Sequence, residues 1–305
     1  RKRDHKDVIR KKKTRCSSTG LKTQKPDLRK KGFQVMTNLT QPKCIFNPLQ
    51  HSLAKQSTQN VDAIEWDDHR YPHQLKSVAT APQTLFTKGT FEHHTNRIAV
   101  IGTRKPTSAS LALTSALVGR LAEGGFSIVS GLALGIDAKA HQGTLQAGGH
   151  TIAVLPCGIE DVYPSRHKQL AERILDSGGA LISQNTGRRK PKKWSFLSRN
   201  HVIAGMSDAV FFVEGALKSG SMHTARYTLL LGRPLYVPVW SRDDVGDLSE
   251  GARALVELKG PELARCLDAK GIFKELLTYQ FEERAVAKLL PLDELSLLER
   301  KKSKE

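Results

Sequence analysis

The sequence contains little that would support a metal centre, a disulfide framework or a membrane anchor. Its four cysteines, Cys16, Cys44, Cys157 and Cys266, are widely separated and form no C-x-x-C pair. We therefore expect no zinc site, no disulfides and a reducing compartment. No apolar run approaches the ~18 residues of a membrane span, and the first residues lack the apolar segment of a signal peptide. These absences predict a cytoplasmic protein without a bound metal or a membrane partner.

Two glycine-rich nucleotide-binding loops are also absent. No G-x-G-x-x-G follows the apolar run 98–101, and no G-x-x-x-x-G-K-[ST] occurs in the chain. Such loops hold dinucleotides and nucleoside triphosphates, so we expect no cofactor of either kind. Asp137 and His141 lie four residues apart on a predicted helix, and capping or a buried polar role is favoured for them over acid–base catalysis. With no nucleophile–base pair in view, we predict that the protein is not an enzyme.

Positive charge is concentrated at the amino-terminal end. The 305 residues carry a formal net charge of +18, and residues 1–60 hold 16 Lys and Arg against 3 Asp and Glu. These residues are rich in Lys, Gln, Ser and Thr and show no sustained period, so we predict a disordered basic arm over 1–60. Such an arm either adds non-specific affinity for nucleic acid or is a solvated tail.

From residue 97 onward, short apolar runs alternate with helical patterns. The runs predict strands at 98–101, 126–129, 151–155, 180–183, 209–213 and 234–237, with helices at 108–123, 136–147, 166–176, 199–205 and 221–231. This alternation is typical of an α/β fold, here an extended Rossmann-like, doubly wound and mostly parallel sheet with helices on both faces.

The domain boundaries follow from the same patterns. We predict one Rossmann-like domain over 61–262, in which an entry segment at 61–96 packs on the sheet. Residues 184–195 are predicted to form a polar, basic loop within it. Residues 263–305 are predicted to be a charged tail without a clear winged helix.

Candidate binding residues follow the predicted strands, where α/β sheets place their ligands. Gly102, Thr103 and Arg104 stand between a buried strand and a helix start. Helix N–H groups and the arginine fork there would suit a phosphate, although an ordinary turn with a solvated arginine explains this stretch equally well. The segment 192–200 combines basic and aromatic residues that suit phosphates and stacked bases, unless Trp194 and Phe196 face the core.

Several motifs in order resemble those of the DNA-processing protein A family (DprA/Smf). They are G-T-R-K-P at 102–106, S-G-L-A-x-G-I-D at 130–137, F-x-x-R-N at 196–200 and S-G-S at 219–221. The resemblance implies an extended Rossmann domain that binds single-stranded DNA, forms a dimer near residues 210–240, assists natural transformation and loads the RecA recombinase. Together with the strand ends, it predicts these DNA-binding residues: Gly102, Thr103, Arg104, Ser130, Gly131, Gly135, Lys193, Phe196, Arg199, Asn200, Lys218, Ser219, Gly220 and Ser221.

Some positions depart from that family's pattern, and a second interpretation stays open. Gln184, Leu197, His201 and Val239 stand where the family usually has Glu, Pro, Arg and Gly, which makes DNA binding a firmer expectation than RecA loading. The alternative is a nucleotide-binding or nucleotide-hydrolysing protein related to the phosphoribohydrolases. Those enzymes carry a glutamate on the helix after their glycine turn, whereas no Glu occurs between Ser221 and Gly232 here.

Overall fold

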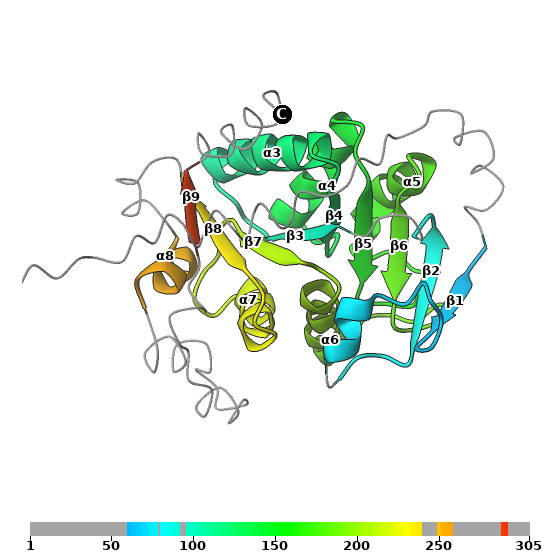
Figure 1. Cartoon of the computed structure of the whole chain (residues 1–305). Helices are drawn as coiled ribbons and strands as arrows, with labels where there is room; N and C mark the ends of the chain where they lie inside the picture. Colours follow the sequence, from blue (N-terminus) through cyan, green and yellow to red (C-terminus); the bar gives the residue numbers. More distant parts are fainter. Residues whose placement is uncertain (1–59, 79, 92–95, 240–248, 259–287, 292–305) are drawn as a thin grey trace, which may run out of the picture. The chain divides into compact units, whose positions relative to one another are not determined.

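One nine-stranded sheet organises the described part of the chain (Figure 1). The computed structural model describes residues 60–78, 80–91, 96–239, 249–258 and 288–291. The predicted arm, up to residue 59, and most of the predicted tail lie outside them. The strands are β1 (Asp62–Glu65), β2 (Thr84–Gly89), β3 (Arg97–Ile101), β4 (Ser127–Ser130), β5 (Thr151–Leu155), β6 (Ala180–Ser183), β7 (Ala209–Phe212), β8 (Leu235–Val239) and β9 (Lys288–Pro291).

Helices cover both faces of this sheet, as the sequence predicts (Figure 1). Helices α3 (Ser108–Glu123), α4 (Ile136–Gln146) and α5 (Lys168–Asp176) lie on one face, and α6 (Lys193–Gly205) and α7 (Gly220–Leu230) lie on the other. The short helices η2 (His73–Ser77), η3 (Ser165–His167) and α8 (Glu250–Glu257) complete the described set. None of the described helices is long and apolar enough to cross a membrane.

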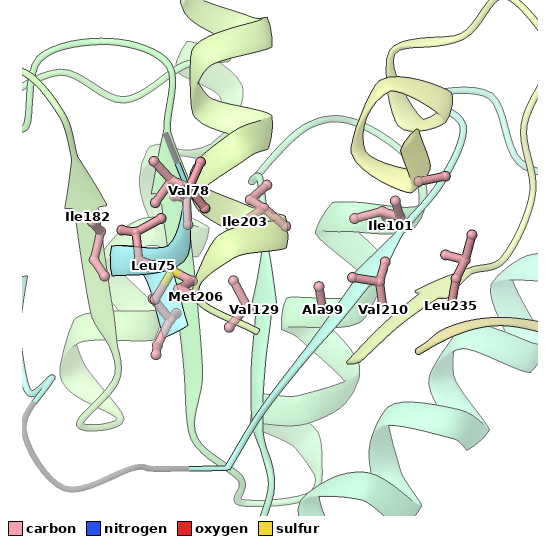
Figure 2. Packing of buried hydrophobic residues seen from close by; sticks show 14 of the residues in the cluster. Leu75, Val78, Ala99, Ile101, Val129, Ile182, Ile203, Met206, Val210 and Leu235 are labelled. Carbon is pink, nitrogen blue, oxygen red and sulfur yellow. The ribbon is translucent and has the colours of Figure 1, made fainter. Parts of the chain in front are cut away.

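Alternating side chains of the strands build the core. Ala99 and Ile101 of β3, with Val210 of β7, pack with Ile203 of α6 and Leu75 of η2 in one buried cluster (Figure 2). Residues one position away along β5 and β6 face α4 and α5 in a second cluster. Because successive strand residues point to opposite faces, an uninterrupted apolar run can bury both sides of a parallel sheet.

The strand order puts the middle of the sheet at β3. The order is β1-β2-β6-β5-β4-β3-β7-β8-β9, with β3 parallel to both β4 and β7. The chain passes from β3 to β4 on one side and later returns to β7 on the other. The sheet is therefore doubly wound, with its topological switch point at the carboxyl end of β3, where such folds bind ligands.

The edges of the sheet differ from the sequence prediction. The entry segment packs on the sheet as expected, but it does so as β1 and β2, an antiparallel pair in which β2 also runs antiparallel to β6. At the other edge, β9 pairs with β8 inside the stretch predicted as a charged tail. These strands are four to six residues long, and so short a run gives a weak periodic signal.

Candidate nucleic-acid interface

The turn after β3 is held tightly by its neighbours. The Thr103 N–H donates to the Glu214 carbonyl at 2.7 Å, and a Cβ on Gly102 would lie 2.6 Å from Cγ1 of Ile136. Thr107 caps α3, since its hydroxyl accepts the Ser110 N–H at 3.2 Å. The turn is therefore a rigid support from which the exposed Arg104 side chain projects.

A carboxylate of the protein lies at the start of α3, beside the predicted anion site. The N–H and hydroxyl of Thr107 donate to Oε2 of Glu214 at 2.9 and 3.2 Å. A carboxylate of the protein is therefore held by the residue that caps the helix, near its positive end. The Arg104 side chain, by contrast, is exposed to solvent.

The glycine-rich turn after β4 is a buried framework. Ser130 is fully buried, and its hydroxyl donates to the Val100 carbonyl at 2.7 Å. Oδ2 of Asp137 accepts the N–H groups of Gly131 and Ala133 at 3.1 and 3.4 Å. Gly135 has φ +79°, and a Cβ there would overlap the Thr103 carbonyl oxygen. Glycine at this position lets the two turns meet.

Helix α6 carries residues that the sequence analysis assigned to a loop. The loop was predicted to reach residue 195, but the helix begins at Lys193, where the Ser195 hydroxyl accepts the Lys192 N–H at 3.1 Å. On this helix Phe196, Arg199 and Asn200 are spaced three and four residues apart, so they share one side. Arg199 reaches the carboxyl ends of β4 and β5, and Asn200 reaches the start of α7.

Arg199 and Asn200 are buried, with 5% and 7% of their surface exposed. Nη1 of Arg199 donates to the carbonyls of Gly131 and Val154, and its Nε donates to Oδ1 of Asn200 at 3.1 Å. Nδ2 of Asn200 donates to the Gly220 carbonyl at 3.1 Å. A Cβ on Gly131 would overlap the guanidinium. Arg199 therefore ties the strand ends together instead of presenting a free cation to solvent.

Burial shifts the pKa of each ionisable group in this framework. Burial raises the pKa of Asp137, and the Arg199 guanidinium opposes that change; burial also lowers the pKa of Arg199, and Asp137 opposes it. Burial lowers the pKa of His141 to about 3, and its Nδ1 lies 2.7 Å from the Thr151 hydroxyl. Asp137 and His141 are thus buried polar residues, the interpretation that the sequence favours.

A small cleft of about 40 Å³ opens beside this framework. Its lining includes Arg104, Gly131, Pro156, Tyr163 and Phe196. The Arg104 guanidinium carbon lies 5.4 Å from the centre of the Phe196 ring, and the Tyr163 ring meets Phe196 edge-on at 5.5 Å. A cation and two aromatic rings therefore line one opening at the carboxyl edge of the sheet.

The predicted site residues divide into three groups. The structure brings Arg104, Gly131, Phe196 and Arg199 together at the cleft. A second group supports the cleft without lining it: Gly102, Thr103, Ser130, Gly135 and Asn200. The remaining five residues lie outside the cleft lining. Lys193 and Lys218 are exposed, and the Gly220 carbonyl accepts from Asn200. Ser219 caps α7 by accepting the Met222 N–H, and its hydroxyl lies 2.8 Å from that of Ser221.

Tyr163 lines the cleft but is not among the residues predicted from the sequence. It is 40% exposed, and it shares the cleft lining with Pro156 and Phe196. Tyr163 comes eight residues after β5 ends, so it lies too far along the chain to read as part of a strand end. The feature of the sequence that could have indicated Tyr163 is an aromatic residue directly before a proline, in the loop after a buried strand.

Comparison with known proteins gives consistent matches. The DprA of Bacillus subtilis is 35% identical over 211 residues, which cover 67% of this chain and 71% of that protein. The Smf protein of Escherichia coli is 38% identical over 189 residues, and the match spans 50% of its length. A solved structure of DNA processing protein A from Helicobacter pylori, described for its single-stranded DNA binding mode, is also similar. It is 26% identical with a TM-score of 0.60, and the match covers 79% of this chain and 97% of that one.

A match to the sequence model of a protein family confirms the resemblance seen in the motifs. The sequence model of the DNA recombination-mediator protein A family matches residues 62–275, a range that includes every candidate site residue from Gly102 to Ser221. The chain therefore belongs to the DNA recombination-mediator protein A family.

Proposed function

We propose that this protein binds single-stranded DNA at the cleft and acts as a DNA-processing protein in natural transformation. Family membership supports the proposal, as does the similarity to the Helicobacter pylori protein. The observation that carries it is the Arg104 guanidinium 5.4 Å from the Phe196 ring. A cation beside an aromatic face offers one group for a phosphate and one for a base, the combination that single-strand binding uses.

The proposed mechanism is binding without catalysis. Arg104 neutralises a phosphate, and Phe196 stacks a base with Tyr163 at its edge. The exposed Lys193 and Lys218 bind phosphates outside the cleft lining. Gly131 and Arg199 shape the wall of the cleft. Such a role calls for a cytoplasmic protein, as the sequence predicts.

A nucleotide-hydrolysing role is less well supported. In the related phosphoribohydrolases a glutamate stands on the helix that follows the glycine turn. The corresponding helix here, α7, reads G-S-M-H-T-A-R-Y-T-L-L and holds no acidic residue. The position that would supply the catalytic carboxylate is therefore filled by other residue types.

A homodimer that hands DNA to the RecA recombinase is the further part of the proposal, and it rests on the family resemblance. We expect sedimentation at micromolar concentration to give about twice the 33.7 kDa mass of one chain. The surface around residues 210–240, with β7, α7 and β8, is the proposed contact. A sedimentation coefficient that stays at the monomer value across the concentration range would contradict the dimer.

Replacing Arg104 with Ala is the test of the proposed function. We expect weaker binding to single strands of any base sequence, and a log–log salt dependence that is shallower by about 0.7, because one phosphate contact is lost. Arg173→Ala is the matched control, since Arg173 is an exposed arginine in the last turn of α5, away from the carboxyl edge. Titrations of an oligonucleotide at three salt concentrations measure both quantities. Equal salt slopes for the two variants would argue against the cleft.

A further inference from the structure

Five cations stand next to the cleft, and of these Lys193 alone has a role in the proposed mechanism. They are Arg188, Arg189, Lys190, Lys192 and Lys193, here called the basic ridge, and all five are exposed. Within the part of the chain that the structure describes, none of them lies within ion-pair distance of a carboxylate. Five like charges in six positions repel one another, and this repulsion is relieved when a polyanion binds.

The basic ridge is held in place by its backbone. The N–H groups of Gly158 and Ile159 donate to the carbonyls of Arg189 and Asn185, both at 2.9 Å, and the Glu160 N–H donates to the Gly187 carbonyl at 3.3 Å. A Cβ on Gly158 would overlap that Gly187 oxygen. These contacts hold Arg189 and the segment just before the ridge against residues 158–160. The hydrogen bonds between Lys192 and Ser195 hold the backbone at the other end of the ridge. Glu160 is the exposed carboxylate beneath the ridge.

The same segment connects the basic ridge to the cleft. Residues 158–160 support the ridge, and in the sequence they stand between Pro156 and Tyr163, which both line the cleft. At its other end the ridge runs into α6, where Lys193 stands one turn before Phe196. Residues three apart on a helix are neighbours. The ridge therefore begins at the edge of the cleft.

Trp194 adds an aromatic surface on the ridge side of α6. Its side chain is 55% exposed, the most exposed large apolar side chain in the described part of the chain. It stands four residues before Ser198, whose hydroxyl donates to Oε1 of Gln184 just ahead of the ridge. Residues four apart share a helix face, so Trp194 lies on the face of α6 toward Gln184 rather than the face of Phe196.

We propose that the basic ridge and Trp194 form a second subsite, which binds the single strand where it leaves the cleft. The ridge cations neutralise successive phosphates, and Trp194 stacks one base. A single strand fits this surface better than a duplex does, because the bases of a duplex are already stacked and leave no face for Trp194. The proposal rests on the proposed function, since the cleft must hold the first part of the same strand.

The test compares a short and a long strand on the full chain. One variant is Lys190→Gln with Lys192→Gln, and the other is Trp194→Ala. The charge control is Lys88→Gln with Arg173→Gln, two basic residues near the amino end of β6 and so away from the carboxyl ends of the strands. The aromatic control is Trp194→Phe. Affinities for oligothymidylates of about 6 and about 20 nucleotides, and for a duplex of the longer length, are measured at several salt concentrations.

The subsite predicts losses confined to the long strand. The lysine variant should bind it roughly 3- to 10-fold more weakly, with a salt slope shallower by about 1.4. Trp194→Ala should lose about 5-fold or more on the long single strand and nothing on the duplex, and Trp194→Phe should retain binding. Lysine losses equal to those of the charge control, or equal losses on both strand lengths, would overturn the subsite while leaving the cleft intact. Absence of single-strand binding by the unchanged chain would overturn both proposals.

Discussion

Replacing Phe196 with Ala should weaken single-strand binding by about 5- to 150-fold, because stacking one base on an aromatic ring contributes about 1–3 kcal/mol. The half-buried Phe196 ring lies beside Arg104 and Tyr163 in the cleft. Stacking releases no counterions, so the salt dependence of the affinity should stay nearly unchanged. Titration with an oligonucleotide at three salt concentrations separates this result from the loss of a charge.

Two further substitutions show whether the aromatic face is what matters. Phe196→Trp keeps a π surface and should retain binding. Phe196→Leu keeps apolar volume beside Arg104 but removes the ring, so it should bind nearly as weakly as Phe196→Ala while staying folded. Thermal unfolding of each variant checks the fold independently. Wild-type affinity in the leucine variant would show that the ring is a packing residue and that bases do not stack on it.

Replacing Arg199 with Met should destabilise the folded protein by about 3–5 kcal/mol, the usual cost of removing one partner from a buried charged network. The substitution leaves the carbonyls of Gly131 and Val154 without their guanidinium donor and removes the cation that opposes the raised pKa of Asp137. Urea unfolding measures the change. The same substitution at the exposed Arg189 is the control and should cost no more than about 0.5 kcal/mol.

The loss at Arg199 should depend on pH, with a sign that Asp137 determines. Burial already raises the pKa of Asp137 above its ordinary value of 3.8, and loss of the guanidinium raises it further. The folded state of the variant then binds a proton more tightly than the unfolded state does. Its deficit in the free energy of unfolding should be smaller near pH 4 and grow as the pH rises through the folded-state pKa. A deficit that is constant from about pH 4 to pH 7 would show that Asp137 does not contribute.

Together these two substitutions separate the support of the site from its contact surface. Arg199 is 5% exposed and acts through carbonyls on two strand ends. Phe196 and Arg104 reach solvent at the cleft. A change at Arg199 should therefore be visible first in stability, and a change at Phe196 first in affinity.

Local patterns were enough to locate most of the elements that carry the candidate site. The apolar runs predicted β5 at 151–155 and β6 at 180–183, and the capped pattern predicted α3 at 108–123, each with the observed bounds. The parallel, doubly wound sheet followed from their alternation with helices. Buried strands and capped helices depend on residues within one or two turns of each other, so this information is present in a short stretch of sequence.

What each charged residue does was decided by contacts between distant parts of the chain. Arg104 and Arg199 both belong to motifs that suggested phosphate binding, yet Arg199 is buried against carbonyls that lie 68 and 45 residues away along the chain. At the start of α3, the Thr107 N–H donates to the carboxylate of Glu214, which lies 107 residues further on. The sequence by itself determined the fold and pointed to the edge of the sheet that carries the candidate site. Only the tertiary structure decided which groups stay exposed, because burial depends on which segments pack together.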